Sequence, residues 1–263
     1  MFSCVHMKKK RAKKLLQDVA ASYDVIAADY DRDRKRAWPI GRAVGPLLRE
    51  YVQPNHHILD IGGGSGQLLP LLGDLELPLR YSGCDISSEV TSLAKSNFGS
   101  QYRQISLSWQ VADMAELPYK KEDFDVVCAL AVLHHVPSKE LRLQAMREAV
   151  RVLRPGGVLI MANWCLDTKQ AENRFNLKPQ RVFNRLKGYD KGDYLIRWKG
   201  SSHTVQTNRY YHSFAEKELT NLVKASGFFI ISNKSVALTT CVKSPAVSWI
   251  TVARKPIEKT PKK

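Results

Sequence analysis

Apolar runs and amphipathic stretches alternate along this chain. Helices are expected over residues 15–30, 40–51, 139–153 and 216–226, where apolar residues recur near the helical spacing. Short, largely apolar runs that suit strands cover residues 57–61, 80–84, 107–112, 125–131, 158–163, 228–232 and 247–253. This order predicts a doubly wound α/β sheet, mostly parallel, whose last two strands lie close enough in sequence to pair antiparallel.

The first predicted strand ends in a glycine turn. Gly62, Gly64 and Gly66 alternate there, which lets the chain reverse sharply and leaves backbone amides uncovered for a ligand. Dinucleotide enzymes need the third glycine one residue later, where this chain has Gln67. Asp85 ends the next predicted strand, where a carboxylate can accept hydrogen bonds from ribose hydroxyls. Strand, turn and acid together predict a nucleotide-type cofactor site.

The formal net charge of +16 is unevenly placed along the 263 residues. Residues 1–16 carry six basic groups and no acid, residues 165–211 carry ten and four, and residues 254–263 carry five and one. The rest of the chain is therefore neutral, which suggests a catalytic body with basic additions that reach a polyanion. For the two termini, merely solubilising tails are an equally good interpretation.

The internal basic segment, residues 165–211, is too long for a plain loop. It follows the carboxyl end of a central strand, where α/β enzymes bind ligands, so we predict a substrate-binding insertion. Its cations alternate with aromatic residues, a mixture that contacts phosphates and stacks on unpaired bases. The candidate RNA-binding residues are Arg181, Arg185, Lys187, Arg197, Lys199 and Arg209.

The cysteines and the hydropathy of the chain indicate the cellular compartment. Five scattered cysteines without a C-x-x-C pair indicate a reducing compartment and argue against a disulfide framework or a structural zinc site. No apolar run approaches the roughly 18 residues that span a bilayer. We expect a soluble, cytoplasmic protein. The lysine-rich residues 8–14 keep a nuclear location open, and a mitochondrial presequence is a less favoured alternative.

Two more groups of residues follow predicted strands at the ligand-binding edge. Asp113 and Met114 end the third strand, where a simple turn acid is the alternative to a cofactor contact. His134 and His135 follow the fourth strand and are candidate substrate contacts, although such a pair is often structural. No acid or cysteine is spaced to complete a metal site with them, so no metal is predicted.

The glycine spacing resembles motif I of the class I S-adenosylmethionine-dependent methyltransferases. The resemblance implies their Rossmann-like fold and S-adenosylmethionine as the methyl donor. In that family an acid at the position of Asp113 commonly hydrogen-bonds the adenine amino group, and the next side chain packs on the ring. The cofactor-binding residues implied in this way are Asp60, Gly62, Gly64, Gly66, Asp85, Ile86, Asp113, Met114 and Ala131.

Residues 20–255 also resemble the tRNA wobble-uridine carboxymethyl methyltransferases, which convert the 5-carboxymethyl group of a wobble uridine in tRNA into its methyl ester. The discriminating parts are Arg34 with Trp38-Pro39-Ile40, and the run Arg209-Tyr210-Tyr211-His212-Ser213-Phe214. Members of that family often work with a small zinc-binding activator that adds a strand to the sheet edge near the third strand. The substrate-site residues implied by the resemblance are Arg34, Trp38, His134, His135 and Tyr211.

The implied reaction suits these residue types. A carboxylate has a pKa of about 4 and needs no general base at neutral pH. Arg34 and His134 can donate hydrogen bonds to this carboxylate. The rings of Trp38, Trp164, Tyr210 and Tyr211 can stack on the uridine and line the site. Val136 departs from the pattern, because relatives often have an aromatic residue there.

The domain boundaries follow from the resemblance and the charge. We expect a basic tail over residues 1–16, a methyltransferase domain over 17–255 with the insertion at 165–211, and a second basic tail over 256–263. Two alternative functions stay open. One is a small-molecule O- or C-methyltransferase, and the other is a catalytically silent RNA-binding subunit of methyltransferase fold.

Overall fold

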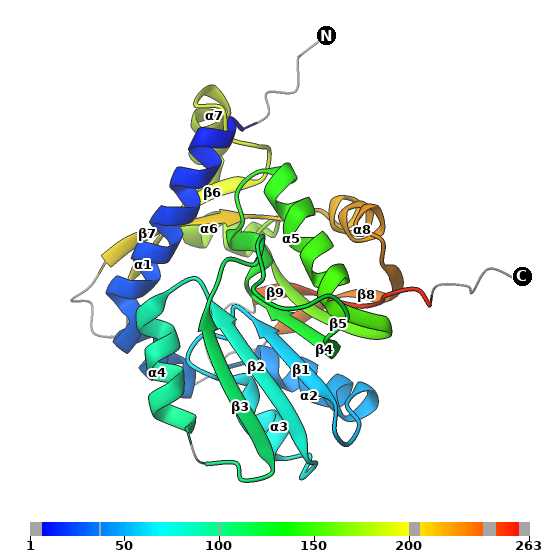
Figure 1. Cartoon of the computed structure of the whole chain (residues 1–263). Helices are drawn as coiled ribbons and strands as arrows, with labels where there is room; N and C mark the ends of the chain where they lie inside the picture. The colour runs from blue at the N-terminus through cyan, green and yellow to red at the C-terminus, as the bar shows by residue number, and fades with distance from the viewer. Residues whose placement is uncertain (1–6, 37, 100, 200–205, 239–245, 258–263) are drawn as a thin grey trace, which may run out of the picture.

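A mixed β-sheet forms the centre of the molecule in the computed structural model, which describes residues 7–36, 38–99, 101–199, 206–238 and 246–257. Within these ranges the sheet has seven strands in the order β3-β2-β1-β4-β5-β9-β8 (Figure 1). The strands are β1 His57–Ile61, β2 Leu79–Asp85, β3 Ile105–Val111, β4 Phe124–Leu130, β5 Leu153–Cys165, β8 Phe229–Leu238 and β9 Ala246–Arg254.

The pairing confirms the predicted class of sheet. β1 pairs in parallel with β2 on one side and β4 on the other, so that Leu59 lies between Ser82 and Val127. β9 runs antiparallel to both β5 and β8. The carboxyl ends of the five parallel strands therefore meet at one edge, and this edge carries Asp85 and the glycine turn.

Helices cover both faces of the sheet. One hydrophobic core packs α2 and α3 against it, and the core on the opposite face packs α5 and α8. Val44 and Leu48, four residues apart on α2, are fully buried as the amphipathic pattern requires. The helices of the sheet domain are α1 Lys9–Arg36, α2 Ile40–Tyr51, α3 Leu68–Gly73, α4 Ser88–Phe98, α5 Lys139–Val152 and α8 Glu216–Ala225, and a short 3-10 turn, η1, covers Leu133–His135.

The N-terminal helix corrects the predicted boundary of the basic tail. α1 begins at Lys9 and extends to Arg36, so residues 9–16 belong to the folded domain. Ala12 and Leu15 are buried there, packed in a cluster with Tyr210 of the insertion. The lysines in residues 8–14 lie on the exposed face of the helix. The second predicted tail lies mostly outside the described residues.

Two strands differ from their predicted extents. β5 starts at Leu153, because Arg154-Pro155-Gly156-Gly157 forms an irregularity within the strand and does not precede it. β8 continues to Leu238, well past the predicted end. It is an edge strand with a polar, largely exposed sequence, so the apolar pattern of a buried strand is missing.

The insertion has its own secondary structure. It consists of α6 Lys169–Phe175, α7 Leu177–Leu186, and an antiparallel pair of strands, β6 Asp193–Lys199 and β7 Gln206–His212. Buried polar groups attach it to the sheet domain. Arg142 of α5 donates to Asp190 at 3.2 Å. Within the β6–β7 pair itself, Asp193 accepts hydrogen bonds from Tyr210 and His212 at 2.5 and 2.7 Å. The insertion is thus fixed above the carboxyl edge of the sheet (Figure 1).

Candidate active site

The turn between β1 and α3 needs its glycines for space as well as for conformation. Gly62, Gly64 and Gly66 have φ values of 64°, 56° and 94°, which side chains disfavour. A Cβ atom on Gly62 would lie 2.4 Å from a Val132 methyl carbon, and one on Gly66 would lie 2.6 Å from the Phe98 ring. Any other residue at either position would displace the turn.

Asp85 sits at the end of β2, beside this turn. Its carboxylate accepts hydrogen bonds from the backbone amides of Gly64 and Ser87, at 3.1 and 3.0 Å. Burial raises the pKa of Asp85, and these amides oppose the shift because they favour the charged form. The backbone amides thus fix the orientation of the Asp85 carboxylate.

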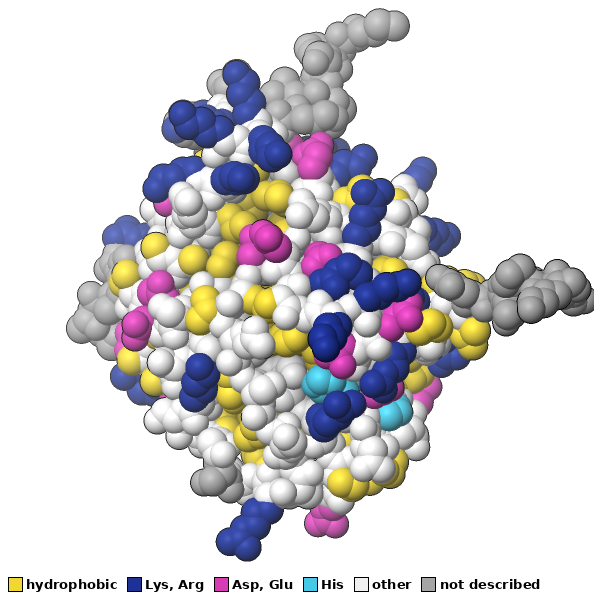
Figure 2. Space-filling view, in the orientation of Figure 1, with side chains coloured by type: hydrophobic (Ala, Val, Ile, Leu, Met, Phe, Trp, Pro, Cys, Tyr) yellow, Lys and Arg dark blue, Asp and Glu magenta, His cyan; other side chains and the backbone are white. Residues whose placement is uncertain are grey.

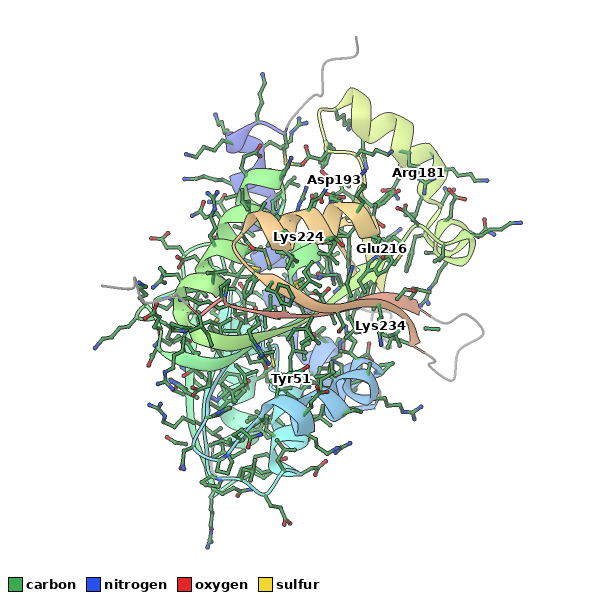
Figure 3. All side chains as sticks on the ribbon, turned by 90° about the vertical axis from the view of Figure 1, so that its right-hand side faces the viewer. Tyr51, Arg181, Asp193, Glu216, Lys224 and Lys234 are labelled. Carbon is green, nitrogen blue, oxygen red and sulfur yellow. The ribbon has the colours of Figure 1, made fainter. Side chains whose placement is uncertain are left out.

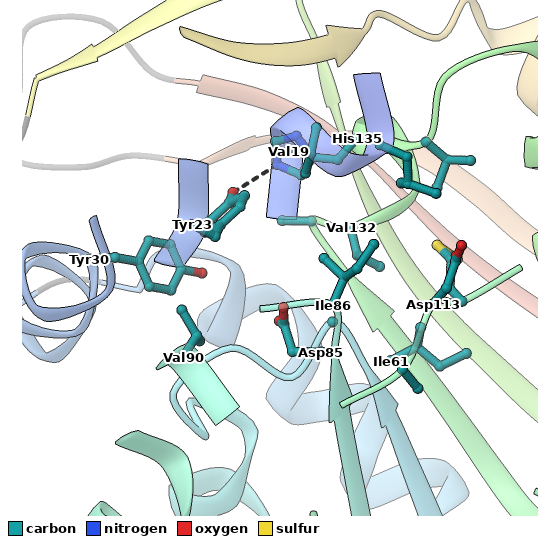
Figure 4. Close-up of a pocket in the computed structure, with 16 residues that line it drawn as sticks. Val19, Tyr23, Tyr30, Ile61, Asp85, Ile86, Val90, Asp113, Val132 and His135 are labelled. Atoms are coloured by element: carbon teal, nitrogen blue, oxygen red, sulfur yellow. Dashed lines mark hydrogen bonds between the residues drawn. The ribbon is translucent and has the colours of Figure 1, made fainter. Parts of the chain in front are cut away.

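A pocket lies at the carboxyl edge of the sheet, and we call it the donor pocket. About 600 Å³ of empty space lies within it, with its opening to solvent included. Figure 4 shows Asp85 and Asp113 at neighbouring strand ends, with α1 on the other side. Its lining comprises Leu16, Val19, Tyr23, Tyr30, Ile61, Gly62, Asp85, Ile86, Val90, Ala112, Asp113, Met114, Ala131, Val132, His135 and Val136.

Most of the predicted cofactor residues meet at this pocket. Gly62, Asp85, Ile86, Asp113, Met114 and Ala131 all line it. Asp113 accepts a hydrogen bond from the amide of Ala115 at 2.8 Å, which fixes its turn. Ala131 has a φ of 61°, an unfavourable conformation for a residue with a side chain, so strain is stored at the pocket wall.

Three predicted cofactor residues, Gly64, Gly66 and Asp60, are not among the residues that line the donor pocket. Asp60 contacts Tyr81 instead. It is buried, and its carboxyl group accepts a 2.9 Å hydrogen bond from the Tyr81 hydroxyl. Burial raises the pKa of Asp60 to about 7, and the Tyr81 hydrogen bond opposes this shift. Asp60 therefore supports the strand behind the turn, and the sequence position alone did not separate the two roles.

Helix α1 supplies a wall that the sequence reasoning missed. Leu16, Val19, Tyr23 and Tyr30 reach the donor pocket from the N-terminal segment. Their helical spacing was visible, but an apolar face predicts only burial and does not say whether a protein core or a ligand covers it. The tyrosine hydroxyls among apolar neighbours were the one available signal.

The two histidines are buried and differ in orientation. The Nδ1 atom of His135 lies 2.8 Å from the Tyr210 carbonyl oxygen, which only accepts, so the hydrogen sits on Nδ1. Its Nε2 atom then accepts from the Tyr23 hydroxyl at 2.9 Å. His134 Nδ1 accepts from the amide of Trp164, and its hydrogen is therefore on Nε2.

Both histidines are neutral. Burial, together with the positive charges of Arg209 and Arg34, lowers the pKa of His135 to about 3, although the Tyr210 hydrogen bond opposes this shift. For His134, burial and then the charges of Arg209 and Arg34 lower the pKa well below its usual range. His134 can therefore contact a carboxylate through its neutral Nε2–H group, because its desolvated and positive surroundings disfavour the charged form.

Arg209 is the largest correction to the predicted RNA-binding set. Its side chain is only 5% exposed, so it does not reach a polyanion on the surface. Its guanidinium donates to the Tyr23 hydroxyl at 2.9 Å and lies over the rings of Tyr23, Trp198 and Tyr211 at 5.3 to 5.7 Å. It belongs to the interior of the site.

Of the other predicted substrate residues, Tyr211 and Arg34 join this group. The rings of His134, Trp164 and Tyr211 lie 5.3 to 5.7 Å apart, with interplanar angles of 15° to 32°. Arg34 lies over the Tyr30 ring at 5.0 Å. Trp38 does not join them, because it packs with the core on the α2 face against Gly41.

The remaining RNA-binding candidates lie on the insertion. Arg181, labelled in Figure 3, lies on α7. It pairs with Glu172 and Asp167, at 2.8 and 3.2 Å, and these carboxylates compete with phosphates for it. Lys187 and Arg197 are exposed, whereas the side chains of Arg185 and Lys199 lie outside the described residues. In Figure 2, Lys and Arg side chains gather over the end of the molecule where α1 begins beside α7.

Two kinds of feature are missing from the described residues. Their His, Cys, Asp and Glu side chains form no group of three that would hold a metal ion. Their helices include none that is long and apolar enough to cross a membrane.

Comparison with known proteins finds methyltransferases with a similar sequence and fold. Residues 59–161 match a family model described as a methyltransferase domain. The tRNA (carboxymethyluridine(34)-5-O)-methyltransferase of Schizosaccharomyces pombe is 26% identical, over 80% of this chain and 88% of that protein. The Arabidopsis thaliana protein of the same name is 33% identical, over 55% and 32%. The demethylmenaquinone methyltransferase of Lactiplantibacillus plantarum is 26% identical, over 82% and 90%. The chain spans 33% of the length of three mammalian relatives.

Solved structures agree on the fold. A SAM-dependent methyltransferase of Methanosarcina mazei superimposes with a TM-score of 0.67 at 27% identity, over 81% of this chain and 98% of that one. A chain from the complex of a Haloferax volcanii methyltransferase with the Trm112 methyltransferase activator has a TM-score of 0.65 at 18% identity, over 92% and 99%. Sheet order, glycine turn, strand-end acids and relatives agree: the chain has the fold of the class I S-adenosylmethionine-dependent methyltransferases, and its residues 59–161 match a methyltransferase domain.

Proposed function

We propose that this methyltransferase forms the methyl ester of the 5-carboxymethyl group on a wobble uridine in tRNA. Two relatives carry the name of this activity, one of them over most of both chains. The charges of the side chains beside the donor pocket also suit this reaction.

One observation carries the proposal: the acceptor side of the donor pocket is positively charged, yet it offers no charged histidine. The fields of Arg34 and Arg209 both act on His134 and His135, whose lowered pKa values make them weak bases. A hydroxyl or carbon acceptor must lose a proton during methylation, whereas a carboxylate has already lost its proton at neutral pH. A site with positive potential and no strong base suits the carboxylate.

The residues of the chain then act by binding and alignment. When bound, S-adenosylmethionine would supply a methyl group from its sulfonium to the carboxylate oxygen, and the electron pair of the broken carbon–sulfur bond would stay on sulfur. We propose that Asp85 holds the ribose and Asp113 the adenine amino group. The wall of α1 excludes water, and alignment in such a dry site provides the rate enhancement.

The aromatic surface suits a planar acceptor. The rings of His134, Trp164 and Tyr211 lie within 6 Å of one another at small interplanar angles. Unpaired bases in RNA are bound by stacking on such rings. We propose that the uridine stacks beside this cluster, with its carboxymethyl group toward the donor pocket.

The partners are a tRNA and an activator subunit. The exposed lysines at the start of α1, with Lys187 on the insertion, offer charge for RNA phosphates. β3 is an edge strand of the described sheet, and its Val111 is 54% exposed. We propose that a small zinc-binding activator pairs with this edge, in line with the complex known for one structural neighbour.

A small-molecule methyltransferase is the second candidate, because the demethylmenaquinone enzyme covers this chain as fully as the fission yeast relative does. The deciding assay measures transfer of radiolabelled methyl groups to tRNA that bears 5-carboxymethyluridine. We expect alkali-labile label in that tRNA, since esters hydrolyse in base. Label in a lipid or quinone fraction, with none in the tRNA, would refute the proposal.

A further inference from the structure

The most unusual group beside the donor pocket is the guanidinium of Arg209. Among the described residues, no carboxylate forms an ion pair with it, and its Nε atom is buried without a hydrogen-bond partner. Buried charges in proteins are normally paired and hydrogen-bonded, because desolvation without compensation is costly. The aromatic rings of Tyr23, Trp198 and Tyr211 compensate only in part, by cation–π attraction.

A second guanidinium adds to this charge. Arg34 acts electrostatically on Arg209, and both act on Tyr23, Tyr30 and Tyr211, so the two arginines share one cluster. Among the described residues, Arg34 also forms no ion pair with a carboxylate. Two like charges held together in a desolvated cluster repel one another. An anion placed between them would relieve both the repulsion and the missing hydrogen bond.

Arg209 is held in a fixed orientation by a directed chain of hydrogen bonds. It donates to the Tyr23 hydroxyl, Tyr23 donates to His135, and His135 donates to the Tyr210 carbonyl. Each donor and acceptor in this chain is determined by the carbonyl oxygen at its end. Tyr23 and His135 both line the donor pocket, so Arg209 lies one hydrogen bond behind its wall.

We propose that Arg209, together with Arg34, is the receptor for the carboxylate of the methyl acceptor. The unpartnered Nε atom of Arg209 is the donor offered to a carboxylate oxygen, and planar guanidinium groups match carboxylates in geometry. Tyr23 is a positioning residue, since it orients Arg209 without contacting the acceptor. The neutral histidines shape the cavity and carry no charge to the acceptor. This inference rests on the proposed function and specifies its recognition chemistry.

A consequence is selectivity for the acid over its amide. 5-Carboxymethyluridine and 5-carbamoylmethyluridine have nearly the same shape, but only the acid carries the negative charge. A neutral amide would leave both guanidinium groups uncompensated and would add an amide donor that faces donors. The wild-type protein should therefore bind RNA with the acid about 10- to 100-fold more tightly than RNA with the amide.

The test measures binding of two anticodon stem-loop RNAs, one with the acid and one with the amide, to the full chain with S-adenosylhomocysteine present. Arg209→Gln should abolish the preference for the acid, because glutamine removes the charge. Arg209→Lys, which keeps a charge but loses the planar fork, should retain part of the preference. Arg103→Gln is the matched control, since Arg103 is exposed before β3 at the opposite edge of the sheet.

The outcomes separate the inference from the proposed function. Calorimetry with S-adenosylhomocysteine alone verifies that each variant keeps a folded donor pocket. If the wild-type protein methylates the acid RNA and Arg209→Gln still prefers the acid, the role of Arg209 is refuted while the function stands. If the wild-type protein neither methylates the acid RNA nor prefers it, both are refuted. Should Arg209→Gln not fold, Arg209→Lys and Tyr23→Phe decide the question, and full retention of the preference in both would overturn the inference.

Discussion

The Tyr23 hydroxyl donates a 2.9 Å hydrogen bond to Nε2 of His135, which joins the N-terminal helix to the turn after β4. The same hydroxyl oxygen accepts from Arg209, 186 residues away along the chain. Three segments that are distant in sequence therefore meet at one phenol group beside the donor pocket. Tyr23 and His135 both line this pocket, so their contact forms part of its wall.

Removing this hydroxyl should loosen the acceptor side. In Tyr23→Phe, the buried Arg209 and His135 each lose a hydrogen-bond partner, which should lower the free energy of unfolding by about 1–3 kcal/mol. We expect a higher KM for the RNA acceptor with cofactor affinity within about threefold of wild type, because the phenyl ring still fills the wall. Urea unfolding and steady-state kinetics measure the two effects. An unchanged KM would contradict a positioning role.

Gly62 should not tolerate even one added methyl group. Gly62→Ala combines a left-handed φ of 64° with a Cβ atom 2.4 Å from Val132, so we expect loss of cofactor binding. Gly45→Ala is the matched control: its nearest side-chain neighbour is 3.8 Å away within α2, where alanine should stabilise by up to about 1 kcal/mol. Calorimetric titration with S-adenosylhomocysteine reports on both variants. Normal affinity in Gly62→Ala would show that the turn moves freely.

The two acids of the cofactor edge should respond differently to the same substitution. Asp85→Asn should lower cofactor affinity about tenfold or more, because the residue lines the pocket and loses a charged acceptor. Asp60→Asn should leave affinity nearly unchanged, since Asp60 lies outside the pocket and an amide oxygen still accepts from Tyr81. Equal losses in both variants would mean that Asp60 contacts the cofactor after all.

The neutral histidines predict acid sensitivity. The pKa of His135 is about 3 in the folded protein, against about 6.5 in an unfolded chain. Between these values the unfolded state binds more protons, so stability falls as the pH drops below about 6.5. Each pH unit should remove up to about 1.4 kcal/mol for this histidine. Urea unfolding at pH 5 and pH 7 measures the slope, which His135→Gln should reduce. The control is a substitution of the half-exposed His56, which should reduce this slope less than His135→Gln does.

The lysines at the start of α1 should strengthen RNA binding but lower the stability of the helix. Cations at a helix N-terminus oppose its dipole, and this helix has no acid in its first turn. Replacing Lys9, Lys10 and Lys13 by alanine should weaken tRNA binding and reduce its salt-dependence slope by about 2–3. Filter binding across a salt series tests this, with Lys120 and Lys121, before β4, as the control pair. An unchanged slope would place the RNA elsewhere.

Much of the donor half of the site followed from the sequence. Apolar runs located the central strands, and alternate glycines identified the turn. Since parallel strands share one carboxyl edge, Asp85 and Asp113 had to lie near it. These features depend on local periodicity and backbone conformation, which a few adjacent residues determine. The cytoplasmic location and the identity of the RNA stay predictions.

Only the tertiary structure decided the acceptor half. Arg209 looked like a surface cation in a basic segment, Trp38 like a wall of the site, and Tyr23 like one more apolar position on a helix. The β6–β7 pair folds back onto α1 and buries Arg209 against Tyr23, while Trp38 turns to the core beneath α2. Charge and hydropathy describe what a side chain prefers, but its partner depends on which distant segments pack together. That packing determines whether a cation contacts solvent, a core or a substrate.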